Sequence, residues 1–223
     1  MTDRVDLKPV LNFLAGLQEN NNKAWFEMNR PAYENARELF ETFVDQLIFG
    51  LGTVEDMKGI LAKDCMMRIY RDIRFSKDKS PYKINMAASI GPGGKKSWRQ
   101  HYYLHLEPHN ASMVAGGLHS QDSAQMIKFR TAIDRDARPF KDIINAKAFK
   151  QYFGTLESEK LKTAPQGFAR DHPEIELLRM KEVVAIHRLS DETVLSPDFS
   201  AHVLKAFEAM KPFLDYLNSI AAA

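Results

Sequence analysis

The chain has 223 residues, 44% hydrophobic and 27% charged, and we expect one domain spanning residues 1–223. Its net charge of +2 excludes a uniformly basic or acidic protein. The single cysteine, Cys65, excludes an internal disulfide and a cysteine-based zinc site, and we expect it to be a buried, unreactive thiol.

Membrane and export signals are absent from the sequence pattern. No apolar run approaches the roughly 20 residues of a membrane-spanning helix. The first residues, Met1–Asp6, contain no apolar segment of the kind that marks a secretory signal. We therefore expect a cytoplasmic protein that does not engage a membrane.

The first part of the chain has a helical pattern. Apolar residues recur every three or four positions from Leu7 to Leu17, and a broader apolar stripe runs from Tyr33 to Ile48. Trp25 and Phe26 lie between them and indicate a short helical turn. Stripes of this kind usually face the core, so we expect these helices to cover one side of the fold.

The apolar period then changes from 3.6 residues to two. Alternation predicts strands over residues 67–73, 84–90, 101–107 and 112–118. The short connections predict an antiparallel meander over about residues 66–119, with one face against helices. Gly116 and Gly117 in the last run indicate a bulge or a close approach of two backbones.

Helices return after the sheet. Apolar residues near 126–133, 140–144 and 149–153 mark them, and a strand is expected near residues 183–189. The last helix begins at about Asp198, and Pro212 should kink or restart it. The fold class is thus α+β, an antiparallel sheet packed by N-terminal and C-terminal helices.

Asp171 and His172 have two interpretations. Asp171 is a suitable helix N-cap, with Glu174 as its reciprocal partner. The alternative is an acid–base dyad with His172. The capping interpretation accounts for more of the surrounding residues and is preferred.

Positive charge is concentrated between Arg68 and Lys83. This block holds six cations and two acids, Asp72 and Asp78, with aromatic residues between them. It predicts a basic, aromatic-edged site for a small molecule that bears a phosphate or carboxylate. The predicted ligand-binding residues are Arg68, Tyr70, Arg71, Arg74, Lys79, Tyr82, Lys83 and Tyr103.

A structural alternative stays open for the same block, because its two acids could pair with neighbouring arginines in a salt-bridged loop. Alternation from Met67 places Arg71 on the apolar face of its strand. An arginine directed inward requires a carboxylate, a ligand anion or a bulge.

His101, Tyr103, His105 and Glu107 share one face of a predicted strand, a face too polar to be core. His105 and Glu107 are candidate catalytic residues for proton transfer, which would make the protein a hydrolase- or transferase-type enzyme. We expect them to lie with Arg71 in one pocket at the sheet's edge. A metal site at His101, His105 and Glu107 and ordinary hydrogen-bonded histidines are the alternatives; we expect neither metal nor cofactor.

The segment Gly91–Arg99 superficially resembles a phosphate-binding glycine-rich loop. Its spacing does not fit, because Lys95 is followed by Lys96 and the segment joins two predicted strands. A basic hairpin tip is the simpler interpretation. Lys95, Lys96, Trp98 and Arg99 also suggest a third function, binding of nucleic acid or another acidic partner.

Five segments stand out as candidate family signatures: Asn20–Phe26, Arg68–Lys83, Tyr102–Pro108, Gly116–Leu118 and Asp171–Arg179. Together they resemble a widespread bacterial and fungal family of uncharacterised proteins, defined as a domain of unknown function. Ser80 stands where family members usually have threonine. The resemblance implies one family domain over nearly the whole chain and supplies no activity.

Overall fold

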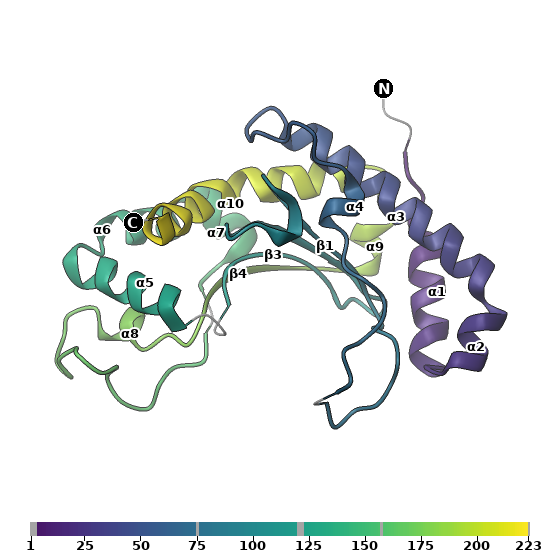
Figure 1. Ribbon diagram of the computed structural model, residues 1–223. Coiled ribbons are helices and arrows are strands. Elements are labelled where there is room, and N and C mark those ends of the chain that lie inside the picture. The colour runs from purple at the N-terminus through teal and green to yellow at the C-terminus, as the bar shows by residue number, and fades with distance from the viewer. Residues whose placement is uncertain (1–3, 75, 120–122, 157, 223) are drawn as a thin grey trace. The chain divides into compact units, whose positions relative to one another are not determined.

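The computed structural model describes residues 4–74, 76–119, 123–156 and 158–222 (Figure 1). Four strands form one antiparallel sheet in the order β1-β2-β3-β4, which confirms the predicted α+β class. Phe75, inside the Arg68–Lys83 block, lies outside the described residues. In chain order the elements are α1 (Lys8–Glu19), α2 (Lys23–Met28), α3 (Arg30–Leu51), α4 (Ala62–Cys65), β1 (Met86–Ile90), η1 (Gly94–Lys96), β2 (Tyr102–Leu106), β3 (Ser112–Leu118), α5 (Ser123–Arg135), α6 (Arg138–Asn145), α7 (Lys147–Phe153), α8 (Ile175–Leu178), β4 (Val183–Leu189), α9 (Asp191–Val194) and α10 (Phe199–Ala222).

The described chain divides into two compact units. Unit 1 contains residues 1–97, 103–114 and 188–205, and unit 2 contains residues 98–102, 115–187 and 206–223. The units interleave along the chain, and β2, β3, β4 and α10 contribute residues to both. The single domain over residues 1–223 stays a prediction. Within the described residues, no helix is both long and apolar enough to cross a membrane.

The helices of unit 1 meet in an aromatic cluster. Phe13 of α1 lies 6.1 Å from Phe26 of α2, and Phe26 lies 4.9 Å from Tyr33 of α3, between ring centroids. Trp25 covers Gly16 of α1 so closely that a Cβ there would lie 2.8 Å from the indole. The helical stripes predicted from the sequence therefore form this part of the core. Cys65 is also buried, as predicted, and burial raises the pKa of its thiol.

The predicted strand over residues 67–73 is wrong. This segment forms only isolated antiparallel bridges, Met66 with Ala88 and Tyr70 with Tyr82, and β1 begins at Met86. The two bridges are four residues apart on the first segment and six apart on the second. Two additional residues on one side interrupt the pairing, so a continuous ladder cannot form.

In unit 2, a second aromatic group surrounds Phe140 of α6. Its ring lies 5.2 Å from Phe129 of α5, and 6.0 Å and 5.4 Å from Phe213 and Tyr216 of α10. The helix α10 continues through Pro212, so the predicted restart there is wrong. Apolar packing of residues such as Phe213 on this helix offsets the hydrogen bond that proline cannot donate.

The predicted close approach at the end of β3 is confirmed at Gly117. Its φ is +134°, and a Cβ at this position would collide with the backbone carbonyl oxygen of Val183 on β4. Both the backbone conformation and the space require glycine here. Gly116, by contrast, has an ordinary φ and would meet the flexible Met210 side chain first.

We predict that Gly117→Ala lowers the free energy of unfolding by at least about 1–3 kcal/mol, because it adds backbone strain and a clash with a carbonyl group. Gly154→Ala is the matched control, since its φ of +59° is also positive but no atom lies within 4 Å of the new Cβ. Urea denaturation measures both variants. Equal losses would show that the contact with Val183 is unimportant.

Candidate functional site

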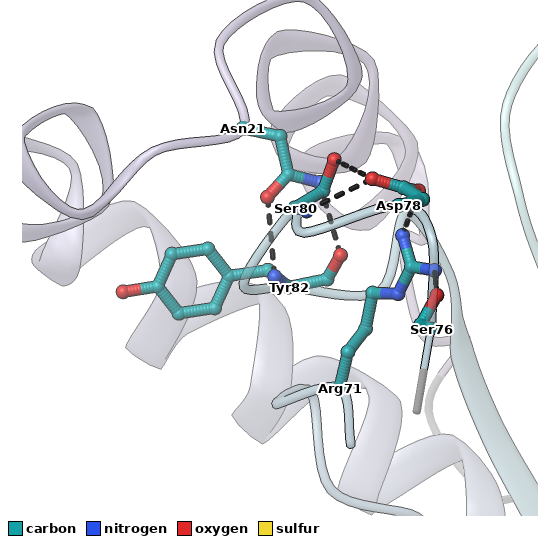
Figure 2. A network of polar contacts seen from close by, with 6 residues as sticks. All are labelled: Asn21, Arg71, Ser76, Asp78, Ser80 and Tyr82. Atoms are coloured by element: carbon teal, nitrogen blue, oxygen red, sulfur yellow. Dashed lines mark hydrogen bonds and ion pairs between the residues drawn. The ribbon is translucent and has the colours of Figure 1, made fainter. Parts of the chain in front are cut away.

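Arg71 is paired inside the Arg68–Lys83 block. Its guanidinium forms an ion pair with Asp78, and Ser80 donates to the same carboxylate from its Oγ at 2.6 Å and its backbone N–H at 2.9 Å (Figure 2). These hydrogen bonds from Ser80, followed by the one from Arg71, hold the pKa of Asp78 well below its usual range. Of the three partners that an inward arginine could require, the structure provides a carboxylate.

Two other cations of the block also have partners within it. Arg74 donates to Asp72 from Nε at 3.0 Å and from Nη2 at 2.7 Å, and the Lys79 ammonium donates to the carbonyl of Ile73 at 2.9 Å. These contacts match the salt-bridged structural alternative. A ligand-binding role for Arg71, Arg74 and Lys79 stays a prediction.

The block is anchored by α2 and by Asn21 in the turn before it. The Asn21 side chain donates to the carbonyl of Tyr82 at 2.9 Å and accepts from its N–H at 3.1 Å (Figure 2). The Tyr82 ring stacks on Phe26 with centroids 4.0 Å apart. Only 3% of Tyr82 is exposed, so this tyrosine belongs to the core, whereas Tyr70 is 48% exposed.

A cavity of about 480 Å³ lies beside the first half of the block, entirely within unit 1. Four of its lining residues are cationic, and none of the described lining residues is acidic. Aromatic and thioether side chains form much of the remaining wall. The lining residues are Tyr33, Arg37, Phe40, Lys63, Met66, Met67, Arg68, Ile69, Tyr70, Asn85, Met86 and Lys95.

Helix α3 supplies one wall of this basic cavity. Tyr33, Arg37 and Phe40 are four and three residues apart and therefore share a helix face. From the sequence we expected Tyr33 and Phe40 in the core and did not identify Arg37 as a site residue. The sequence feature that could have identified Arg37 is its positive charge within an otherwise apolar stripe. Arg37 contacts Glu41 at 3.5 Å, and burial raises the pKa of the Tyr33 hydroxyl.

Lys63 and Lys95 complete the cationic lining. Lys63 lies on α4, and the Lys95 ammonium donates to its carbonyl oxygen at 2.7 Å. This contact fixes η1 beside α4, so Lys95 lies at the cavity and not on the simple hairpin tip that the sequence indicated. Lys96 is exposed in the same unit, whereas Trp98 and Arg99 belong to unit 2, where Trp98 is 57% exposed. Nucleic-acid binding by this segment stays a prediction.

A second cavity, of about 320 Å³, lies beside the other half of the block. It contains the Arg71–Asp78 pair, the half-buried Lys83 and several hydrogen-bonding side chains. Asn85 lines both cavities. The lining residues are Gln18, Asn21, Arg71, Asp78, Ser80, Tyr82, Lys83, Ile84 and Asn85.

The polar residues of β2 form a separate group. His105 Nε2 lies 2.7 Å from a Glu107 oxygen, and the Tyr103 hydroxyl lies 3.4 Å from His105 Nδ1. His101 and His105 are each only 8% exposed, so the expectation that this strand face is too polar for the interior is wrong. The carboxylate and hydroxyl partners of His105 permit its burial.

His105 and Glu107 line neither of the two cavities described above, so the expected single pocket with Arg71 is not formed by them. Their roles in proton transfer, and that of Tyr103 in ligand binding, stay predictions. In the described part of the chain, no group of three or more His, Cys, Asp and Glu side chains converges to hold a metal ion.

The predicted N-cap at Asp171 is wrong. Helix α8 begins at Ile175 with Glu174 as its N-cap residue, and Asp171 is exposed in the preceding turn. The His172 ring is the actual acceptor, since Nδ1 accepts the backbone N–H of Glu174 at 3.0 Å. Its Nε2 lies 3.1 Å from Asp134. An acceptor at Nδ1 places the proton of neutral His172 on Nε2, toward that carboxylate.

Fold and site thus define an α+β protein with a basic, aromatic-edged cavity. The chain belongs to the family described as conserved hypothetical protein (DUF2461), whose model matches residues 9–216. No curated protein and no solved structure matches the chain. The matched span includes the Arg68–Lys83 block, and the use of this block as a family mark stays a prediction.

We predict that Asp78→Asn accelerates amide hydrogen exchange at Ser80 while the melting temperature changes little, because the pair is exposed. The folded-state pKa of Asp78 is lowered, so its stabilising effect is present above about pH 4 and is lost as the pH falls below this value. In acid, the exchange rate of the Ser80 amide in the wild type, corrected for the intrinsic rate, should approach the rate in Asp78→Asn. A pH-independent difference would contradict this assignment.

We predict that His172→Ala lowers the free energy of unfolding by about 0.5–1.5 kcal/mol, because the backbone N–H of Glu174 loses its hydrogen-bond acceptor. Asp171→Ala should change it by less than about 0.5 kcal/mol, because that side chain is exposed. Chemical denaturation of the two variants compares the neighbours directly. A larger loss of unfolding free energy for Asp171→Ala than for His172→Ala would support Asp171 as the capping residue.

Proposed function

We propose that this protein binds a small molecule bearing a phosphate or carboxylate group in the basic cavity. The observation that carries the proposal is the charge of the lining: Arg37, Lys63, Arg68 and Lys95 meet there without an acidic residue among the described lining side chains. Like charges that share a low-dielectric concavity repel one another and attract counter-ions.

Arg68 is the principal anion contact in this proposal. It is exposed, and it has no ion pair or hydrogen bond to the part of the chain that the structure describes. Its planar guanidinium can hold two oxygens of one phosphate or carboxylate. Arg71 and Arg74, in the same block, each have a carboxylate partner already.

The walls of the cavity specify the rest of the ligand. Tyr33, Phe40 and Tyr70 offer aromatic surfaces, and Met66 and Met67 offer adaptable thioethers. A volume of about 480 Å³ is within the range of small-molecule sites. The ligand therefore combines an anionic group with an apolar or aromatic part.

We predict that phenyl phosphate binds the wild type and raises its melting temperature, and that Arg68→Met weakens this binding about tenfold or more through loss of a charged hydrogen-bonding partner. Isothermal titration calorimetry measures the affinity, and a thermal melt confirms folding. Phenol, which has the ring without the charge, should bind far more weakly.

Lys77→Met is the matched control, because it removes one positive charge from the same block at an exposed residue that lines neither cavity. Its affinity for phenyl phosphate should stay within about twofold of wild type, as for a charge screened by salt outside the site. Equal losses in both variants would mean that only the net charge of the block matters. No binding to the wild type would refute the proposed function for this probe.

A further inference from the structure

The interruption in backbone pairing lies at Arg68. On one side of it, the Met67 N–H donates to the carbonyl of Ala87 at 2.8 Å. On the other side, the Lys83 N–H donates to the carbonyl of Ile69 at 2.7 Å. Arg68 alone therefore lies opposite the three residues 84–86, so the regular pairing is interrupted at this point.

This gap leaves polar groups without partners. Neither Arg68 nor Asn85 forms a hydrogen bond within the described residues, and Lys83 has no ion pair there. Lys83 is half-buried, and its pKa is lowered by burial and then by the charge of Arg68. Arg68 and Lys83 thus lie near each other, Asn85 lines a cavity with each of them, and neither cation forms an ion pair within the described residues.

The same three residues are distributed over the linings of the two cavities of unit 1. Arg68 lines the basic cavity, Lys83 lines the second cavity, and Asn85 lines both. The basic cavity has aromatic and thioether walls. The second cavity is more polar, with Gln18, Ser80 and the internally neutralised Arg71–Asp78 pair.

We propose that Arg68, Lys83 and Asn85 hold the phosphate of a phosphodiester whose aromatic or apolar substituent occupies the basic cavity and whose hydroxyl- or amide-bearing substituent occupies the second. This inference rests on the proposed function and specifies its ligand class. A simple carboxylate carries one substituent on its carbon, whereas a phosphodiester extends from its charge in two directions. The guanidinium, the ammonium and the Asn85 amide can all donate to its two charged oxygens.

The experiment compares one diester with its two halves. The probes are thymidine 5′-monophosphate p-nitrophenyl ester, p-nitrophenyl phosphate and thymidine 5′-monophosphate, each titrated by calorimetry. The diester should bind roughly tenfold or more tightly than either half, because it fills both cavities in one binding event. Lys83→Met should weaken all three probes by about tenfold through loss of a shared charged contact.

Two further variants separate the parts of the site. Gln18→Leu should weaken binding of the diester and of thymidine 5′-monophosphate but leave p-nitrophenyl phosphate unchanged. Asn85→Asp keeps the side-chain shape and adds a negative charge between the cations, so binding of all three probes should fall below detection. Melting temperatures measured without ligand show whether each variant folds. If Asn85→Asp does not fold, the affinities of the two single variants Lys83→Met and Gln18→Leu test the proposal.

The outcomes distinguish this inference from the proposed function. In one outcome, Arg68→Met abolishes binding of p-nitrophenyl phosphate while Lys83→Met and Gln18→Leu bind the diester like wild type. That result would refute the phosphodiester proposal and support the proposed function of the basic cavity. If the diester binds no more tightly than p-nitrophenyl phosphate, the second cavity is not used. If none of the probes binds the wild type, both proposals fail.

Discussion

The backbone pairing of residues 66–71 with residues 81–88 determines the geometry of the candidate site. Its two ends are fixed by the bridges of Met66 with Ala88 and Tyr70 with Tyr82, and the unequal spacing between those bridges leaves Arg68 opposite the three residues 84–86. A regular ladder would have satisfied the backbone groups at this point. The interruption instead exposes a cation and an amide between two cavities.

Charge compensation within the block depends on the same pairing. Past the bridge at Tyr70 the chain turns, and Asp78 and Asp72 come within reach of Arg71 and Arg74. Before the bridge, Arg68 lies near Lys83 and shares a cavity with Asn85, and it forms no ion pair within the described residues. One run of basic residues is therefore divided into a neutralised loop and a free cationic edge, although the sequence distributes its charges almost evenly along the block.

The sequence predicted what depends on local pattern. Period-2 alternation identified the strands around Met86, Leu104 and Val114, and the paired glycines identified the close approach at Gly117. The sequence pattern failed where the structure of a segment depends on a partner that it does not contain. Alternation at Met67–Ile73 looks like a strand, but the two additional residues that interrupt it lie on the opposite segment. His105 is similarly buried because Glu107 and Tyr103 satisfy its ring, which polarity alone could not show.

The basic cavity illustrates the same limit for function. Arg37, Lys63, Arg68 and Lys95 come from four separate segments, and only Arg68 belongs to the block that drew attention to positive charge. Arg37 sits in a core stripe, and Lys95 in a glycine-rich loop, so neither has a local signal for a shared site. Their convergence follows from helix α3, helix α4 and η1 packing around the first bridge. Isolated cations in a sequence are usually neutralised or solvated, so the positions of these four gave no indication of a shared lining. Arg37 contacts Glu41, whereas Arg68 forms no ion pair within the described residues, and a concave lining that is cationic without acidic members favours an anionic ligand.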